Sequence, residues 1–126
     1  RVRLLEKTNA RYLTREQVSE VIDLIVMDVS FISATLVLPA VVGATFSDTT
    51  GEQSMRQIIV LIKPQFEVGR ELVGKGGIVR DEKAQATSVE KVREAIISLG
   101  VTTTDVIDSP ILGAEGNREF LLYAKF

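Results

Sequence analysis

The sequence contains no cysteine and no histidine among its 126 residues. The absence of cysteine excludes disulfides, cysteine nucleophiles and the usual zinc sites, and the absence of histidine removes the most common general base. We expect no metal site in this chain. A sequence without cysteine also fits a cytoplasmic setting, which is the localisation that we expect. Any catalysis must therefore use lysine, aspartate, glutamate, serine, tyrosine or a cofactor.

Long hydrophobic segments and a strong net charge are also lacking. The longest mostly apolar run covers residues 31–46, and serine, threonine, proline and glycine interrupt it. It is shorter than the stretch of about 20 residues that a membrane-spanning helix needs, so we expect no membrane span. The net charge is −2 and the pI is about 5.2, which gives no global sign of nucleic-acid binding. The 15 lysines and arginines still allow a local basic surface.

Strand-like and helix-like segments alternate along the chain. Thr14 and Gln17 match a capping box at a helix start, and Asp81 is placed to cap the last helix. Pro39 is expected to kink the middle helix or to begin its second part. The predicted strands cover residues 2–6, 23–28, 57–62, 101–107 and 119–126, the predicted helices cover residues 13–21, 30–46 and 81–99, and residues 46–56 and 64–80 are predicted loops.

This order of elements predicts an α/β fold with a mainly parallel sheet. Continuous apolar strands separated by helices are typical of sheets that helices cover on both faces. The last two strands are joined by the loop at residues 108–117, so we expect them to pair as an antiparallel hairpin at a sheet edge. We find no internal repeat and no domain boundary inside the chain.

Charged and polar residues stand at one end of several predicted strands. Asp28 ends one strand, Lys63 follows another, and Asn117 and Glu119 stand where the last strand begins. Ligands of such folds bind beyond the carboxyl ends of the strands. A partly desolvated lysine among carboxylates suits the activation of a hydroxyl, because it can accept or share a proton. The alternative is a charged rim of ordinary ion pairs.

The segment "GRELVGKGG" at residues 69–77 nearly matches a phosphate-binding P-loop. Gly76 stands where that motif needs serine or threonine for magnesium, so we do not expect a site of nucleotide hydrolysis. Two interpretations stay open. Either the glycines serve a loop with positive φ angles, or the loop places Lys75 and Arg80 against substrate phosphates.

Three further residues have a structural and a functional interpretation. Asn9, in "TNAR", is either an ordinary turn residue or a hydrogen-bond partner of a ligand that lies across the strand ends. Phe31 and Phe66 follow Asp28 and Lys63 closely, and they are either core residues or aromatic rings that stack on a base.

Four segments together closely resemble the TlyA-type (haemolysin A) family of FtsJ-like ribosomal RNA 2'-O-methyltransferases. They are "DVSFIS" at 28–33, "LIKPQFE" at 61–67, "VGKGGIVRD" at 73–81 and "SPILGAEGNREFL" at 109–121. The resemblance covers essentially the whole chain, in order. It implies a Rossmann-like, S-adenosylmethionine-dependent methyltransferase fold with an antiparallel last strand, S-adenosyl-L-methionine as cofactor, and ribosomal RNA or a ribosomal subunit as partner.

The resemblance also implies roles for single residues. FtsJ-like enzymes use a Lys-Asp-Lys-Glu tetrad around the target ribose hydroxyl, and its last three members fall on Asp28, Lys63 and Glu119. Lys63 would activate the 2'-hydroxyl, and Asp28 and Glu119 would orient it. Asp28 would also border the sulfonium end of the cofactor, and Asn9 falls where the family contacts the adenine. Lys75, Arg80 and Asn117 are our candidate contacts with the substrate RNA.

Several parts of the family pattern have no counterpart in residues 1–126. They are the first lysine of the tetrad, the first two strands with their glycine-rich cofactor loop, the acidic residue that binds the cofactor ribose, and an S4-type RNA-binding domain. We therefore interpret residues 1–126 as the C-terminal part of one FtsJ-like methyltransferase domain, and expect this part alone to bind cofactor poorly and to be inactive. The alternatives are a non-catalytic RNA-binding module and a membrane-active haemolysin. The acidic pI and the lack of a basic amphipathic helix speak against the haemolysin.

Overall fold

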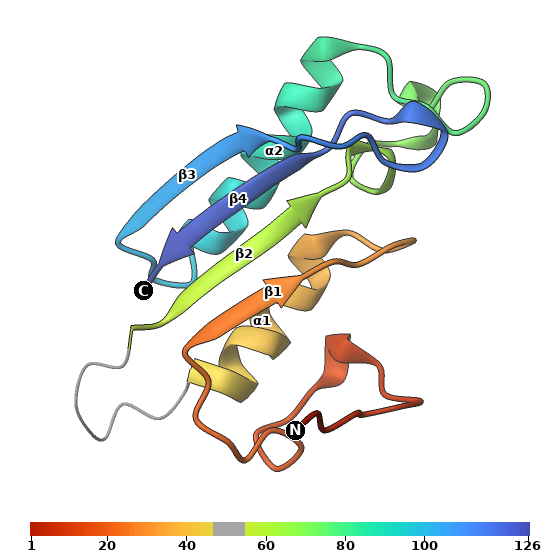
Figure 1. Ribbon diagram of the computed structural model, residues 1–126. Coiled ribbons are helices and arrows are strands. Elements are labelled where there is room, and N and C mark those ends of the chain that lie inside the picture. Colours follow the sequence, from red (N-terminus) through yellow and green to blue (C-terminus); the bar gives the residue numbers. More distant parts are fainter. Residues whose placement is uncertain (47–54) are drawn as a thin grey trace.

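The computed structural model describes residues 1–46 and 55–126 and shows a four-stranded sheet with two α-helices (Figure 1). Its strands are β1 (Leu24–Met27), β2 (Gln57–Ile62), β3 (Thr103–Asp108) and β4 (Phe120–Lys125), and its α-helices are α1 (Ala34–Phe46) and α2 (Glu82–Ile97). Four short 3-10 helices, η1 (Ala10–Tyr12), η2 (Pro64–Phe66), η3 (Arg70–Leu72) and η4 (Ala114–Gly116), lie in the connections.

The strand order is β1-β2-β4-β3. β1 and β2 are parallel, and β4 is antiparallel to both of its neighbours, β2 and β3. Three of these strands therefore run in the same direction and the last strand runs against them, which confirms the predicted sheet. β3 and β4 form the expected antiparallel pair, and β3 lies at the sheet edge.

The hydrophobic core lies between the sheet and the two α-helices. Alternate residues of the strands point into it, and Ile58, Val60 and Ile62 of β2 are fully buried. Leu38 of α1 and Ile96 of α2 are fully buried against this face. Each such aliphatic side chain contributes about 2 kcal/mol when it leaves water.

Both α-helices begin and end close to the predicted positions. α1 starts at Ala34 and continues through Pro39, which is exposed. Asp81 caps α2 as predicted, because its carboxylate accepts a hydrogen bond from the Lys83 backbone N–H at 3.0 Å. Gly100 follows α2 with a φ of +98°, a backbone conformation that glycine adopts at a helix end without strain.

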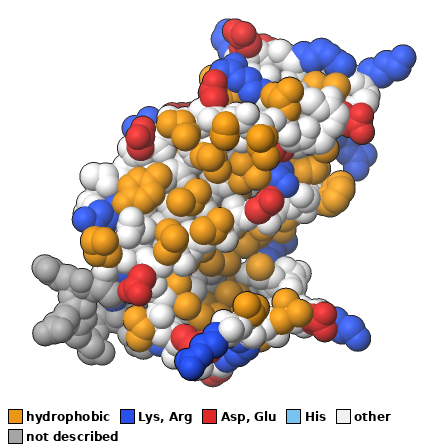
Figure 2. Space-filling view, viewed as in Figure 1, with side chains coloured by type: hydrophobic (Ala, Val, Ile, Leu, Met, Phe, Trp, Pro, Cys, Tyr) orange, Lys and Arg blue, Asp and Glu red, His pale blue; other side chains and the backbone are white. Residues whose placement is uncertain are grey.

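The prediction that helices cover both faces of the sheet is wrong for the described residues. The chain passes from β1 through α1 to β2 and from β2 through α2 to β3, and both crossovers move in the same direction across the sheet. Right-handed crossovers in one direction place their helices on the same face. The second face is bare, with Val26 69% and Ile107 58% exposed, and Figure 2 shows apolar side chains gathered over it.

The predicted strand at residues 2–6 and the predicted helix at residues 13–21 are also wrong. Val2 and Leu4 are 92% and 72% exposed, and residues 2–6 pair with no strand in the part of the chain that the structure describes. Gln17 Oε1 does accept a hydrogen bond from the Thr14 N–H at 3.0 Å, as in a capping box, but only turns follow. A short helix without a packed apolar face is marginal in water, so one cap does not sustain it. Most of the predicted loop at 46–56 lies outside the described residues.

Candidate active site

Three of the predicted site residues stand at one edge of the sheet. Asp28 directly follows β1 and Lys63 directly follows β2, and these two strands are parallel. Glu119 directly precedes β4, which is antiparallel to β2, and Ile62 pairs with Phe120 in that ladder. Lys63 and Glu119 are therefore the next residues across the same ladder, as the sheet pattern predicted.

Asp28 and Lys63 form a direct ion pair. Lys63 Nζ lies 2.7 Å from Asp28 Oδ1 and donates a second hydrogen bond to Ser30 Oγ at 2.9 Å. The lysine side chain is 15% exposed and the aspartate side chain is 61% exposed. An ammonium has three donors, and these contacts account for two. The arrangement places a largely buried amine beside a carboxylate that is open to solvent and to a ligand.

Glu119 joins this edge through Gln65 and not through Lys63. The Glu119 side chain is buried, and its Oε2 accepts a hydrogen bond from Gln65 Nε2 at 2.9 Å. Gln65 follows Lys63 by two residues and lies in η2. Within the described part of the chain, no hydrogen bond or ion pair connects Glu119 to Lys63 or Asp28. Two members of the predicted trio are thus in contact, and the third is held one side chain away.

Phe31 is an exposed aromatic residue in a strained backbone conformation. Its φ is +63° and its side chain is 91% exposed, so it is not a core residue. Its ring packs against Phe66, with a distance of 5.0 Å between the ring centroids. A left-handed conformation costs a bulky residue about 1–3 kcal/mol, and such strain tends to occur at functional sites.

Asn9 has the role of a turn residue in this structure. Its side-chain oxygen accepts a hydrogen bond from the Arg11 N–H at 3.1 Å and so caps η1, which packs beside α1. No hydrogen bond connects Asn9 to Asp28 or Lys63 within the described residues. A role of Asn9 in cofactor binding stays a prediction.

The loop that carries Lys75 and Arg80 is a compact turn. Gly74 and Ile78 form an isolated β-bridge, and Gly76 and Gly77 have φ angles of +79° and +76°. The positive φ angles explain the glycines without a nucleotide. Lys75 and Arg80 are both exposed, and the Arg80 guanidinium donates to the Lys75 carbonyl oxygen at 3.3 Å.

Asn117 holds this turn in place and does not face solvent. The residue is 2% exposed, and its Oδ1 accepts a hydrogen bond from the Val79 N–H at 3.0 Å. Its Nδ2 donates to the carbonyl oxygens of Gly77 at 2.8 Å and Ala114 at 3.0 Å. With its amide buried and used on both sides, Asn117 is a structural residue, and this geometry speaks against its predicted contact with RNA.

Glu67 is an important residue to which the sequence analysis gave no role. Its carboxylate accepts hydrogen bonds from the Ala34 N–H at 2.8 Å and from Ser33 Oγ at 2.5 Å, and Lys91 Nζ lies 3.2 Å away. A carboxylate at this position satisfies a free N–H and matches the positive end of helix α1. The signal was present in "KPQFE", but its partner at the start of α1 is 33 positions away in the sequence.

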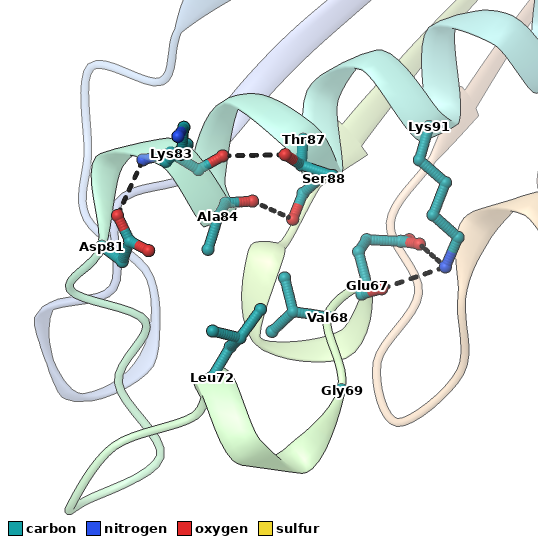
Figure 3. Close-up of a pocket in the computed structure, with 10 residues that line it drawn as sticks. All are labelled: Glu67, Val68, Gly69, Leu72, Asp81, Lys83, Ala84, Thr87, Ser88 and Lys91. Atoms are coloured by element: carbon teal, nitrogen blue, oxygen red, sulfur yellow. Dashed lines mark hydrogen bonds and ion pairs between the residues drawn. The ribbon is translucent and has the colours of Figure 1, made fainter.

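A pocket of about 330 Å³, which Glu67 helps to line, lies between α2 and residues 67–72 (Figure 3). Val68, Leu72 and Ala84 give it an apolar wall, and Lys91 reaches Glu67 at one end. Asp28, Lys63 and Glu119 do not line it.

Among the described residues, none of the helices is both long and apolar enough to cross a membrane, and no group of three or more potential metal ligands occurs.

The sheet has an antiparallel last strand beside parallel strands and polar side chains at the strand ends, as the resemblance to FtsJ-like methyltransferases implied. The sequence-family model of the FtsJ-like methyltransferases matches residues 1–126. The chain belongs to the FtsJ-like methyltransferase family, which confirms the resemblance found in the four segments.

Similar proteins support the same grouping. The chain is 44% identical over 125 residues to the 16S/23S rRNA (cytidine-2'-O)-methyltransferase TlyA of Mycobacterium tuberculosis. The aligned residues are 99% of this chain and 44% of that protein. It is also 36% identical over 124 residues to Hemolysin A of Brachyspira hyodysenteriae. Here the aligned residues are 98% of this chain and 49% of that protein. A solved structure named "Putative hemolysin from Streptococcus thermophilus" superposes with a TM-score of 0.82 at 37% identity, over 99% of this chain and 43% of that one. The chain thus spans about half the length of these relatives.

Proposed function

We propose that residues 1–126 are the C-terminal part of one S-adenosylmethionine-dependent methyltransferase domain that methylates the 2'-hydroxyl of a ribose in ribosomal RNA. The ion pair between Lys63 and Asp28 carries this proposal, because it places an amine and a carboxylate at the strand ends where this family of folds binds ligands. The names of the relatives, which include an rRNA 2'-O-methyltransferase, support the reaction and the substrate class.

The residues present fit one side of a cofactor site. The Asp28 carboxylate is 61% exposed, so it is open to a cationic sulfonium group while it holds Lys63. Asn9 uses its side-chain oxygen to cap η1, which leaves its amide nitrogen as a donor toward an adenine. When bound, S-adenosylmethionine supplies an electrophilic methyl group on its sulfonium sulfur. Residues 1–126 supply no glycine-rich loop for it, so we expect this part alone to bind the cofactor weakly.

Lys63 is the proposed proton acceptor. When bound, the cofactor would supply the methyl group and keep the electron pair of its carbon–sulfur bond. Lys63 Nζ would take the hydroxyl proton in its neutral form, because a neutral amine keeps a lone pair while its two N–H groups donate to Asp28 and Ser30. Asp28 and Ser30 fix the position of Nζ through contacts of 2.7 and 2.9 Å. The main contribution of the protein is alignment, since a methyl transfer needs the oxygen, carbon and sulfur in line.

Exposed groups near this edge are suited to RNA. Lys75, in the turn at residues 74–78, and Arg80, which follows that turn, are exposed and can contact phosphates. Phe31, with its ring exposed and supported by Phe66, can stack on the base of the target nucleotide. We assign the choice of nucleotide to none of these residues.

The experiment is a methyl-transfer assay with the full-length protein that contains this chain, a labelled methyl donor and ribosomal subunits. The expected result is a 2'-O-methylated nucleotide in the ribosomal RNA, mapped by mass spectrometry. Binding to ribosomal RNA with a steep salt dependence but without methyl transfer would identify a non-catalytic RNA-binding module instead. Release of dye from liposomes at physiological salt, without transfer, would identify a membrane-active protein.

A further inference from the structure

A single hydrogen bond couples the loop of Lys63 to the start of β4. Gln65 Nε2 donates to Glu119 Oε2 at 2.9 Å, between residues 54 positions apart in the sequence. Glu119 is 6% exposed, so solvent does little to hold its carboxylate in one orientation. Among the described residues, Gln65 is the side-chain hydrogen-bond donor to this carboxylate. The orientation of Glu119 therefore depends on Gln65.

The two polar atoms of the Gln65 amide are in different environments. An ionised carboxylate only accepts hydrogen bonds, so the nitrogen of the amide must face Glu119 and the oxygen must point away. That oxygen, Oε1, is buried and has no hydrogen-bond partner among the described residues. A buried acceptor without a partner costs free energy. An apolar side chain of similar size would avoid this cost, but it would leave Glu119 without its donor.

Gly113 limits the same carboxylate from another side. A Cβ atom at this position would lie 2.1 Å from Glu119 Oε2, far closer than atoms approach without a bond. The φ of Gly113 is −80°, which every residue adopts, so its backbone conformation does not require glycine. The Gly113 N–H donates to the Asn117 carbonyl oxygen at 2.7 Å and thereby fixes the loop. The carboxylate of Glu119 occupies the space that a side chain would fill.

We propose that Gln65 is a positioning residue, which together with the space at Gly113 holds the Glu119 carboxylate in one orientation at the reaction site. The inference rests on the proposed function and on the role that the family resemblance implies for Glu119, which is to orient the target hydroxyl. Gln65 does not touch the reacting atoms. It acts through Glu119, and it belongs to the same loop as Lys63, so both groups are fixed by one short segment.

Two substitutions at Gln65 predict opposite pH dependences. Gln65→Leu removes the donor, and a buried carboxylate without a donor takes up a proton more readily. The kcat of this variant relative to the parent protein is therefore expected to fall as the pH is lowered. Gln65→Glu places two carboxyl groups at hydrogen-bond distance, and they can share one proton but repel when both are ionised. The relative kcat of this variant is expected to fall as the pH is raised.

The assay measures kcat and KM from pH 5 to 9 in the full-length protein, with Gln57→Leu as matched control. Gln57 is the first residue of β2, at the end of the strand away from Gln65. Its Oε1 accepts a hydrogen bond from the Tyr123 hydroxyl at 2.8 Å. We expect Gln57→Leu to keep the pH profile of the parent protein. At the least favourable pH, both Gln65 variants should lose about tenfold or more in kcat, because small misplacements of a reacting constellation have effects of this size.

Several outcomes overturn the inference. Equal pH profiles for the parent protein and both Gln65 variants would do so, and so would a loss of kcat that is independent of pH and follows a lower melting temperature. If the Gln65 variants do not fold, Gly113→Ala tests the same carboxylate, because the added Cβ would displace Glu119, and it is expected to lower kcat. Gly43→Ala is its control, because an added Cβ there meets nothing within 4 Å. If the parent protein transfers no methyl group, or Lys63→Ala transfers at the parent rate, the proposed function fails instead.

Discussion

The carboxylate of Glu67 accepts a hydrogen bond from the backbone N–H of Ala34 at 2.8 Å, so a residue that follows β2 caps the helix that follows β1. The same carboxylate binds Ser33 Oγ. Ser33 is the last residue of the segment 28–33, and Glu67 is the last residue of the segment 63–67. The hydrogen bonds of Glu67 therefore connect the loop that follows Asp28 to the loop that follows Lys63.

Loss of this cap should lower stability. Glu67→Gln keeps the shape of the side chain but removes the charge. Lys91 then loses its ion pair and keeps only its hydrogen bond to the Glu67 carbonyl oxygen. We expect the free energy of unfolding to fall by about 1.5–3 kcal/mol, the range for hydrogen bonds to a charged group. Urea denaturation measures this change, with Glu90→Gln on the exposed side of α2 as control. An equal stability of the two variants would contradict the assigned role of Glu67.

Lys63 should be required as a proton acceptor and not only as a positive charge. Lys63→Ala is expected to lower kcat by about 100-fold or more, the usual contribution of a general base. Lys63→Arg keeps the charge, but a guanidinium does not lose its proton, so this variant should be about as impaired. Methyl transfer under single-turnover conditions measures the step. Lys125→Ala, at the opposite end of β4, is the control. High activity of Lys63→Arg would restrict Lys63 to an electrostatic role.

Phe31 should show a conflict between stability and activity. The variants Phe31→Gly and Phe31→Ala both lack the ring, but only glycine adopts a φ of +63° without strain. We expect Phe31→Gly to be more stable than Phe31→Ala by about 1 kcal/mol, and both to methylate RNA more slowly. Thermal denaturation and kcat/KM provide the two measurements. Equal stability of the two variants would show that the positive φ is not a source of strain.

Asn117 and Lys75 should respond differently, although they lie near the same turn. Asn117→Ala leaves the Val79 N–H and the Gly77 carbonyl oxygen without this partner, whereas the Ala114 carbonyl oxygen keeps the backbone N–H of residue 117. We expect a loss of about 3 kcal/mol in stability. Lys75→Ala should leave stability unchanged. It should reduce the slope of log K against log salt for RNA binding by about 1, the value for one phosphate contact. An unchanged salt slope would remove Lys75 from the proposed RNA surface.

The sequence predicted best where periodicity and local chemistry agree. Residues 57–62 are a continuous apolar run and form the central strand β2, and Asp81 caps α2 through a contact two residues along the chain. The convergence of Asp28 and Lys63 followed from the parallel direction of their strands. These features depend on short segments and on general rules of sheet topology.

The errors arose where distant contacts decide the outcome. Val2 and Leu4 have the residue types of a strand, but residue types alone do not decide which strand a segment pairs with, and residues 2–6 join neither edge of the described sheet. The polar groups that hold the site, Gln65 on Glu119 and Glu67 on Ala34, join residues 54 and 33 positions apart, and no local pattern signals them. The bare face of the sheet followed from the direction of both crossovers, which periodicity does not reveal.

That bare face has a thermodynamic consequence for the folded chain. Two rows of side chains on it, one through Val26, Ile59 and Tyr123 and one through Leu61, Leu121 and Ile107, keep part of their hydration in the native state. Unfolding of residues 1–126 should therefore release less newly hydrated apolar area than is usual for its length, and its heat-capacity increment should be correspondingly small. The native state of this polypeptide should also bind dyes such as ANS, a property usually associated with partly folded proteins.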